Sequence, residues 1–247
     1  MREDYYSLYY KIEREHWWFK VRNKILLDLI RSKAPEGKLK ILNIGVATGY
    51  TTELLFELGE VTSVEYDESC YRYLKTFLKG EIVNASITAL PFANETFDIV
   101  CAFDVIEHVQ EDQLGVDEMG RVCKKNGIIY ITVPAHKFLW SEHDVINHHV
   151  RRYKAKDVLR LFLKYKIIYY SYFNIILFIP IALVRVTKTM IWGLPQTETA
   201  QSDFKSVEPT IFSKISEKLF SIENWFIKKN ISFPIGVSFL IIARKKD

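Results

Sequence analysis

Short apolar runs alternate with amphipathic stretches along most of the chain. Runs rich in Ile, Val and Phe predict buried strands, and apolar residues three or four positions apart predict helices. The predicted strands are residues 39–44, 61–65, 81–84, 97–103, 127–133, 167–173 and 237–243. The predicted helices are residues 15–32, 51–58, 68–78, 105–122 and 157–163. Strands that alternate with helices build βαβ units, so we expect an α/β fold: a doubly wound, mostly parallel seven-stranded sheet with helices on both faces.

A mostly helical, apolar segment interrupts this alternation before the last strand. The expected parts are an N-terminal helical cap (1–36), the core (37–173), an apolar helical insertion (174–233) and the last strand of the core sheet (234–247). The insertion suits a substrate lid, a dimer surface or a membrane contact, and the sequence does not choose among them.

The stretch 167–184 contains no charged residue and is near the length of a membrane span. Its first half is strand-like and Pro180 interrupts the second half, so we favour a core or interfacial helix over a spanning one. Arg185, Lys188 and Trp192 follow, and this order is typical of a helix lying at a membrane interface.

Composition places the chain among ordinary globular proteins. Of its 247 residues, 49% are hydrophobic and 26% charged, which excludes a disordered chain and a fibrous repeat. A net charge of +4 does not indicate a nucleic-acid partner. Cys70, Cys101 and Cys123 show no metal-binding spacing and indicate free, buried thiols in a reducing compartment. The N-terminus shows no secretory signal, so we expect a cytoplasmic location, with peripheral contact at the inner membrane face left open.

A small-residue loop follows the first predicted strand. Gly45, Ala47 and Gly49 lie between that strand and a helix, where a ligand can approach the backbone closely. Glu65 ends the second strand about 20 residues on, a position suited to hydrogen-bonding a ribose diol. Together these features indicate a nucleoside-containing cofactor without choosing between NAD and S-adenosylmethionine.

Further motifs make that choice. Leu90-Pro91-Phe92, Phe97-Asp98-Ile99-Val100 and Asp104-Val105-Ile106-Glu107-His108-Val109 follow in order. Together with the glycine loop they resemble class I S-adenosylmethionine-dependent methyltransferases, which have a Rossmann-like fold, over about residues 15–165. His16-Trp17-Trp18-Phe19-x-x-Arg22 is similar to the opening motif of a bacterial and archaeal subgroup, the type 11/23-like enzymes.

The resemblance implies which residues bind the cofactor. Gly45, Ala47 and Gly49 would face its methionine part and ribose, and Glu65 would hold the ribose hydroxyls. The full implied set is Arg22, Asn43, Gly45, Ala47, Gly49, Glu65, Tyr66, Ala85, Ser86, Phe103 and Asp104. Arg22 would pair with the methionine carboxylate, or Trp17 and Trp18 would form a buried lid with Arg22 at the surface. Two residues depart from the family pattern: Asn43 stands where the family usually has Asp, and Ala47 where it often has Gly.

Asp104-x-x-Glu107-His108 has two interpretations. At a helix start Asp104 and Glu107 would form a capping box, and we favour this structural role. Alternatively, Asp104, Glu107 and His108 share one helix face and would hold Mg²⁺ or another divalent cation, as in metal-dependent O-methyltransferases with a similar E-x-x-E-H motif. We therefore treat Mg²⁺ as the less favoured of the two.

The loop after the fifth strand holds four of the six histidines. His143, Asp144 and His148 are the candidates for a general base that takes a hydroxyl proton. A polar loop with hydrogen-bonded histidines is the alternative, since methyl transfer can also proceed by positioning alone.

These features predict a methyltransferase that uses S-adenosylmethionine and releases S-adenosylhomocysteine. The expected acceptor is an apolar or lipid-linked small molecule methylated on oxygen. The alternatives are a metal-assisted RNA 2′-O-methyltransferase and a non-catalytic cofactor-binding module. The sequence leaves open the acceptor, the choice of O, N or C methylation, and the oligomeric state.

Overall fold

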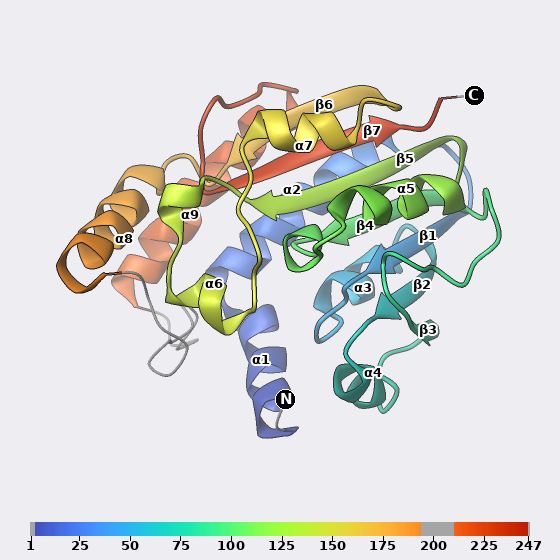
Figure 1. The fold of residues 1–247 in the computed structure, drawn as a ribbon, viewed down its shortest axis with the longest axis horizontal. Helices are drawn as coiled ribbons and strands as arrows, with labels where there is room; N and C mark the ends of the chain where they lie inside the picture. The colour runs from blue at the N-terminus through green and yellow to red at the C-terminus, as the bar shows by residue number, and fades with distance from the viewer. Residues whose placement is uncertain (1–2, 194–209, 247) are drawn as a thin grey trace.

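Seven strands form one twisted sheet in the computed structural model, which describes residues 3–193 and 210–246 (Figure 1). Part of the predicted insertion, residues 194–209, lies outside the described residues. The strands are β1 (Leu39–Ile44), β2 (Gly59–Glu65), β3 (Glu81–Asn84), β4 (Phe97–Phe103), β5 (Cys123–Pro134), β6 (Lys166–Phe173) and β7 (Ser238–Arg244). Their order is β3-β2-β1-β4-β5-β7-β6, and β7 runs antiparallel to both its neighbours. The remaining pairs are parallel, so the predicted mostly parallel, Rossmann-like sheet is confirmed.

Helices cover both faces of this sheet. The α-helices are α1 (Glu3–Glu15), α2 (Trp17–Lys33), α3 (Tyr50–Leu55), α4 (Glu68–Leu74), α5 (Asp112–Val122), α6 (Glu142–Ile146), α7 (Ala155–Leu161), α8 (Phe178–Trp192) and α9 (Ile211–Lys228). Two short 3₁₀ helices, η1 (Ile106–His108) and η2 (Lys137–Leu139), lie in the loops after β4 and β5.

The alternation of side chains along each strand divides the core into two layers. Ile41 in β1 packs with α2 and α9 on one face, whereas Leu42 packs with α5 and α7 on the other. Ile99 and Val100 in β4 divide in the same way. Because successive strand residues point to opposite faces, strands buried on both sides must be continuously apolar.

Helix α9 belongs to one of these layers, although it lies in the predicted insertion. Its Phe220 and Ile227 are fully buried beneath the sheet. Trp17 of the HWWF motif packs edge-on against Phe220, with ring centroids 6.3 Å apart, and Asn224 donates a hydrogen bond to Asp28 in α2. The motif therefore joins α2 to α9 and contributes to the core.

The region 105–122 is largely helical, as predicted, but it is not one continuous helix. The chain forms η1, breaks, and starts α5 at Asp112. The Val150 amide donates to the Glu107 carbonyl at 2.8 Å, the oxygen that a continuing helix would have used for its own bond to residue 111. A tertiary contact thus ends the helical turn beside the loop after β5.

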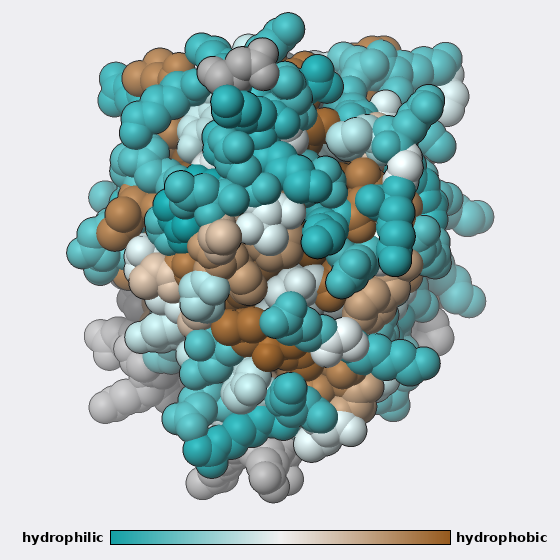
Figure 2. All heavy atoms as spheres, turned by 90° about the vertical axis from the view of Figure 1, so that its right-hand side faces the viewer, coloured by the Kyte–Doolittle hydropathy of each residue, from teal (hydrophilic) through white to brown (hydrophobic). Residues whose placement is uncertain are grey.

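Other features agree with the sequence prediction. Cys70, Cys101 and Cys123 are buried and form no disulfide. Among residues 3–193 and 210–246, no helix has both the length and the apolar character needed to cross a bilayer. Figure 2 shows the side of the molecule at the right of Figure 1: hydrophilic residues cover most of it, and a band of hydrophobic residues crosses its centre.

Candidate functional site

The loops that carry the predicted site residues follow β1, β2, β4 and β5. These four strands are parallel, so their carboxyl ends meet at one edge of the sheet. The reversal of strand order lies here too, since β2 and β4 flank β1. Ligands of doubly wound folds bind at such a point.

The loop after β1 needs residues that tolerate a left-handed backbone. Gly45 has φ 69° and Gly49, the N-cap of α3, has φ 85°. A Cβ on Gly45 would lie 2.4 Å from Cγ2 of Val105, so the loop passes too close to the chain after β4 for any side chain. Ala47 also has a positive φ, 47°, and therefore holds a strained conformation where the resembling family often has glycine.

Glu65 is the acidic residue at the end of β2. Its carboxylate accepts hydrogen bonds from the Ala47 amide at 3.3 Å and the Asp67 amide at 2.9 Å, one on each oxygen. Burial raises the pKa of Glu65. The two bonds fix the carboxylate against the glycine loop and leave further lone pairs for a ligand hydroxyl. Tyr66 next to it is 76% exposed.

Three other predicted cofactor residues lie around this centre. The buried Asn43 donates from its side-chain amide to Oγ1 of Thr52, which ties β1 to α3. Ala85 and Ser86 follow β3 and are half-buried, and the Ala85 amide bonds to the Glu65 carbonyl. Asn43 therefore has a packing role at the position where the family usually has a charge.

A partly buried ion pair follows the strand β4. Asp104 is the first residue after β4, and its carboxylate accepts a hydrogen bond from Nη2 of Arg22 in α2. The guanidinium lies over the rings of Trp18 and Phe103, 5.5 and 5.6 Å from their centroids. Nε of Arg22 is buried and has no hydrogen-bond partner among the described residues. Of the two interpretations of Arg22, the one that places its charge at the surface is therefore wrong.

The favoured capping-box role for Asp104 and Glu107 is also wrong. Asp104 has φ 58°, and η1 has no side-chain cap. The Asp104 carboxylate turns toward Arg22 instead. An N-cap residue needs an extended backbone with its side chain over the first turn, and Asp104 has neither.

Glu107 lies fully buried at this edge of the sheet. Neither of its carboxylate oxygens has a hydrogen-bond partner among the residues that the structure describes. Burial and the nearby Asp104 carboxylate raise the pKa of Glu107 well above its usual range. Ligand atoms of Glu107, His108 and His149 all lie within 4.8 Å of one another. The metal site predicted from the sequence consisted of Asp104, Glu107 and His108. In the structure the third member of the cluster is His149, not Asp104.

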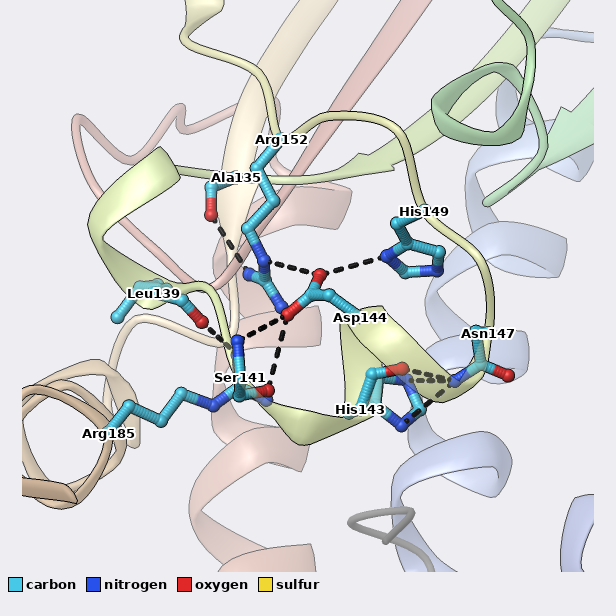
Figure 3. A network of polar contacts seen from close by, with 9 residues as sticks. All are labelled: Ala135, Leu139, Ser141, His143, Asp144, Asn147, His149, Arg152 and Arg185. Atoms are coloured by element: carbon cyan, nitrogen blue, oxygen red, sulfur yellow. Dashed lines mark hydrogen bonds and ion pairs between the residues drawn. The ribbon is translucent and has the colours of Figure 1, made fainter. Parts of the chain in front are cut away.

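His149 is held by Asp144 in a network of polar contacts (Figure 3). The Asp144 carboxylate bonds to Nδ1 of His149 at 2.9 Å and to Nε of Arg152 at 2.7 Å. Its other oxygen accepts a hydrogen bond from the Ser141 amide at 2.8 Å. This bond is part of the capping box at the start of α6. Burial alone would raise the pKa of Asp144, but the bonds from His149 and Arg152 outweigh it and hold the pKa below its usual range.

This geometry revises the general-base candidates. Asp144 is fully buried with all its bonds directed at protein groups, so it does not support the predicted role as a base and instead positions His149. His143 is half-buried beside Asn147, and His148 is exposed with φ 56°. His149 was missed: it was the neighbour of His148 in a histidine-rich loop, and no spacing rule separates the two.

The cofactor that the family resemblance implies fits these residues. Its amino-acid end is zwitterionic, and Arg22 and Asp104 present one cation and one anion side by side. The buried, unpartnered Nε of Arg22 is an observation of this structure that favours an anionic ligand there. The Glu65 carboxylate suits a ribose diol.

Comparisons with known proteins point to the same family. Residues 42–131 match the family model described as a methyltransferase domain. A probable S-adenosylmethionine-dependent methyltransferase of Mycobacterium tuberculosis is 25% identical over 125 residues, 50% of this chain and 44% of that protein. A demethylmenaquinone methyltransferase of Clavibacter sepedonicus is 32% identical over 41% of this chain and 43% of its own length. A ubiquinone biosynthesis O-methyltransferase of Bartonella tribocorum is 27% identical over 45% of this chain and 49% of its own length.

The chain thus spans less than half the length of these curated relatives. Two solved structures resemble it over almost its whole length. A methyltransferase from Thermotoga maritima superposes with a TM-score of 0.59 at 16% identity, covering 98% of this chain and 96% of that one. The phosphoethanolamine N-methyltransferase 2 of Haemonchus contortus, in complex with S-adenosylmethionine, superposes with a TM-score of 0.58 at 14% identity. The match covers 91% of this chain and 53% of that one. At these identities the likeness shows the fold alone.

Proposed function

The chain carries a class I S-adenosylmethionine-dependent methyltransferase domain, and we propose that it transfers the cofactor's methyl group to a hydroxyl oxygen of an apolar, lipid-linked acceptor. The observation that carries the proposal is the Asp144–His149 pair beside the buried Glu107, next to the proposed cofactor residue Asp104. A positioned base near the cofactor is what attack by a hydroxyl oxygen requires.

In this proposal Arg22 and Asp104 hold the methionine end of the cofactor and Glu65 holds its ribose. Bound S-adenosylmethionine supplies an activated methyl group on a sulfonium. The acceptor oxygen attacks the methyl carbon in line, the carbon–sulfur bond breaks with its electron pair on sulfur, and S-adenosylhomocysteine leaves. The hydroxyl proton passes to a base in the protein.

His149 is suited to accept that proton. Because the ionised Asp144 carboxylate can only accept, it fixes the hydrogen of His149 on Nδ1. The lone pair of the ring then lies on Nε2, and a ring nitrogen of His149 lies within 4.8 Å of ligand atoms of Glu107 and His108. Asp144 also stabilises the imidazolium that forms after proton transfer.

A divalent cation at Glu107, His108 and His149 is a second candidate for activating the acceptor. Two imidazole nitrogens and a carboxylate suit Mn²⁺, Fe²⁺ or Zn²⁺ better than Mg²⁺, which prefers oxygen ligands. The unpartnered carboxylate of Glu107 and the bond of Asp144 to Nδ1 of His149 both fit such a site, with Nε2 as the ligand atom of His149. A bound cation would lower the pKa of the acceptor hydroxyl.

An exposed aromatic side chain in the loop that carries His149 supports an apolar acceptor. Phe138 is 53% exposed, and on its inner side it contacts His136 and Phe178. The relatives named above also include enzymes whose names refer to demethylmenaquinone and to ubiquinone biosynthesis.

The test begins with calorimetric titration of S-adenosylmethionine and S-adenosylhomocysteine, with and without Mn²⁺, Zn²⁺ and Mg²⁺. Release of S-adenosylhomocysteine is then measured with prenylated catechols and hydroquinones, and with a short RNA. Turnover on the ring compounds supports the proposal, and turnover on RNA replaces it with the RNA alternative. Cofactor binding without any turnover supports the non-catalytic module.

His149→Asn tests the base itself. We expect turnover to fall at least about 100-fold while cofactor affinity stays within about twofold, because general-base catalysis contributes roughly that factor. The neighbouring His148→Asn is the comparison, since the sequence named His148 among its three candidates, whereas the bond to Asp144 belongs to His149. The reverse ranking of the two variants would contradict the assignment.

A further inference from the structure

Helix α8 turns apolar side chains outward. Its exposed large hydrophobic residues are 56% to 81% accessible: Ile179, Leu183, Val184, Met190 and Ile191. Ile179 and Leu183 are four positions apart, and Leu183 and Val184 lie seven positions before Met190 and Ile191, so the five residues lie along one side of the helix. A continuous apolar surface of this kind marks an interaction site.

The inner side of α8 is already packed. Phe178 is buried against His136, with ring centroids 5.6 Å apart, and also contacts Phe138 of η2. Arg185 donates from Nη1 to the Leu139 carbonyl at 2.8 Å, which fixes the helix against η2 (Figure 3). The outward side is therefore held in its orientation by contacts on the opposite side of the helix.

Helix α9 presents a second exposed stripe of mixed character. Ile211, Ile215, Ile222 and Trp225 are each about half exposed or more. Lys218 and Lys229 lie on the same side by helical spacing, and Nζ of Lys229 lies 3.7 Å from the Trp225 ring centroid. Isoleucine and tryptophan interleaved with lysine are typical of helices that lie at a membrane surface.

The charge on the two helices favours an anionic partner. The basic residues of described residues 175–193 and 210–230 are Arg185, Lys188, Lys214, Lys218, Lys228 and Lys229. Two acidic residues oppose them, and one of these, Glu223, is buried with its carboxylate on the Ile176 amide. Lys228 pairs with Asp28, which leaves a clear cationic surplus at the surface.

We propose that the exposed faces of α8 and α9 form a surface that binds anionic lipid bilayers, with both helices lying in the headgroup region. The described helices do not have the length and apolar character to cross a bilayer, so insertion stays interfacial. In Figure 1 both helices lie at the left of the molecule, away from the side shown in Figure 2. The inference does not rest on the proposed function, because it concerns binding by the protein alone.

The surface also lies beside the loop that carries the candidate site. Helix α8 contacts η2, and η2 leads directly into α6 and Asp144. A protein seated on a membrane through α8 would therefore hold this loop close to the bilayer, where lipid-linked molecules reside.

Co-sedimentation with vesicles tests the proposal. We expect the full chain to bind vesicles of phosphatidylglycerol and phosphatidylcholine more tightly than vesicles of phosphatidylcholine alone, and less tightly as salt is raised. Leu183→Gln together with Ile191→Gln should weaken binding at least about tenfold, because two buried side chains are lost from the bilayer. Lys214→Gln with Lys218→Gln should weaken binding to the anionic vesicles roughly fivefold for each lysine.

Leu163→Gln is the matched control, since Leu163 is 78% exposed and lies outside both helices. It should bind vesicles as the wild type does. Failure of the wild type to sediment with anionic vesicles overturns the proposal, as does unchanged binding by the Leu183→Gln/Ile191→Gln variant. A wild-type dimer in sedimentation velocity that the same two substitutions convert to monomer would assign the face to a second copy instead.

Discussion

At the scale of single residues, the carboxylates of this site differ in how they are held. Glu65 is bonded on both oxygens by backbone amides, Asp104 is paired with Arg22, and Glu107 has neither kind of partner among the described residues. Such differences in environment assign different chemical roles to groups of the same type.

Glu65→Ala should weaken binding of S-adenosylhomocysteine by about 1–3 kcal/mol, because the ribose hydroxyls would lose a charged acceptor. Calorimetry measures the affinity, and thermal unfolding checks that the protein still folds, since two backbone amides also lose their acceptor. Glu68→Ala removes a carboxylate of an exposed ion pair three residues on and should leave the affinity unchanged. Equal affinities for the wild type and Glu65→Ala would remove Glu65 from the cofactor site.

The sequence predicted where Glu65 and the glycine loop lie, at the ends of β2 and β1, because their positions depend on local order along the chain. It did not identify the bond between Asp144 and His149, or the turn of Asp104 toward Arg22. Both depend on a loop and a helix from different parts of the chain meeting at the sheet edge. Nothing in the spacing of His143, His148 and His149 could rank them.

At the scale of elements, tertiary contacts decide where helices end. The Val150 amide donates a hydrogen bond to the Glu107 carbonyl, and the helical turn ends there. In the connection before α8, the Ile176 amide donates to the Glu223 carboxylate. The sequence predicted the seven strands well because each contains a short run rich in apolar or β-branched residues. The helix breaks depend on distant partners and could not be predicted.

Burial raises the pKa of Glu223 to about 7. The folded state therefore holds a proton that the unfolded chain releases near pH 4.5, and stability should fall as pH rises from about 4.5 to about 7. Glu223→Gln keeps an oxygen for the Ile176 amide and removes the charge. It should be more stable than the wild type at pH 8, by on the order of 2 kcal/mol, and similar to it at pH 4.5.

Urea unfolding at the two pH values measures this difference. Glu217→Gln, on the same helix but only half-buried, is the control. Its free energy of unfolding should match that of the wild type at both pH values. A Glu223→Gln protein whose stability changes with pH as the wild type's does would contradict the raised pKa.

At the scale of the whole molecule, the apolar segment before the last strand divides into two different structures. Helix α9 packs beneath the sheet and against α2, whereas α8 rests on η2 with its apolar side outward. Hydrophobicity alone could not separate them, because both helices are rich in apolar residues. The three-dimensional contacts make α9 part of the core and leave α8 as its exposed companion.

Phe220→Ala should therefore destabilise the entire domain. Phe220 is fully buried between Trp17 and Phe173, so its removal leaves a cavity in the layer that covers the sheet and should cost about 3–5 kcal/mol. Ile222→Ala, two positions on and 49% exposed, should cost less than about 1 kcal/mol. Urea unfolding followed by far-ultraviolet circular dichroism and by tryptophan fluorescence should give coincident single transitions, because α9 unfolds with the sheet. A separate early transition for the fluorescence of Trp225, with the sheet intact, would show instead that α9 is a detachable lid.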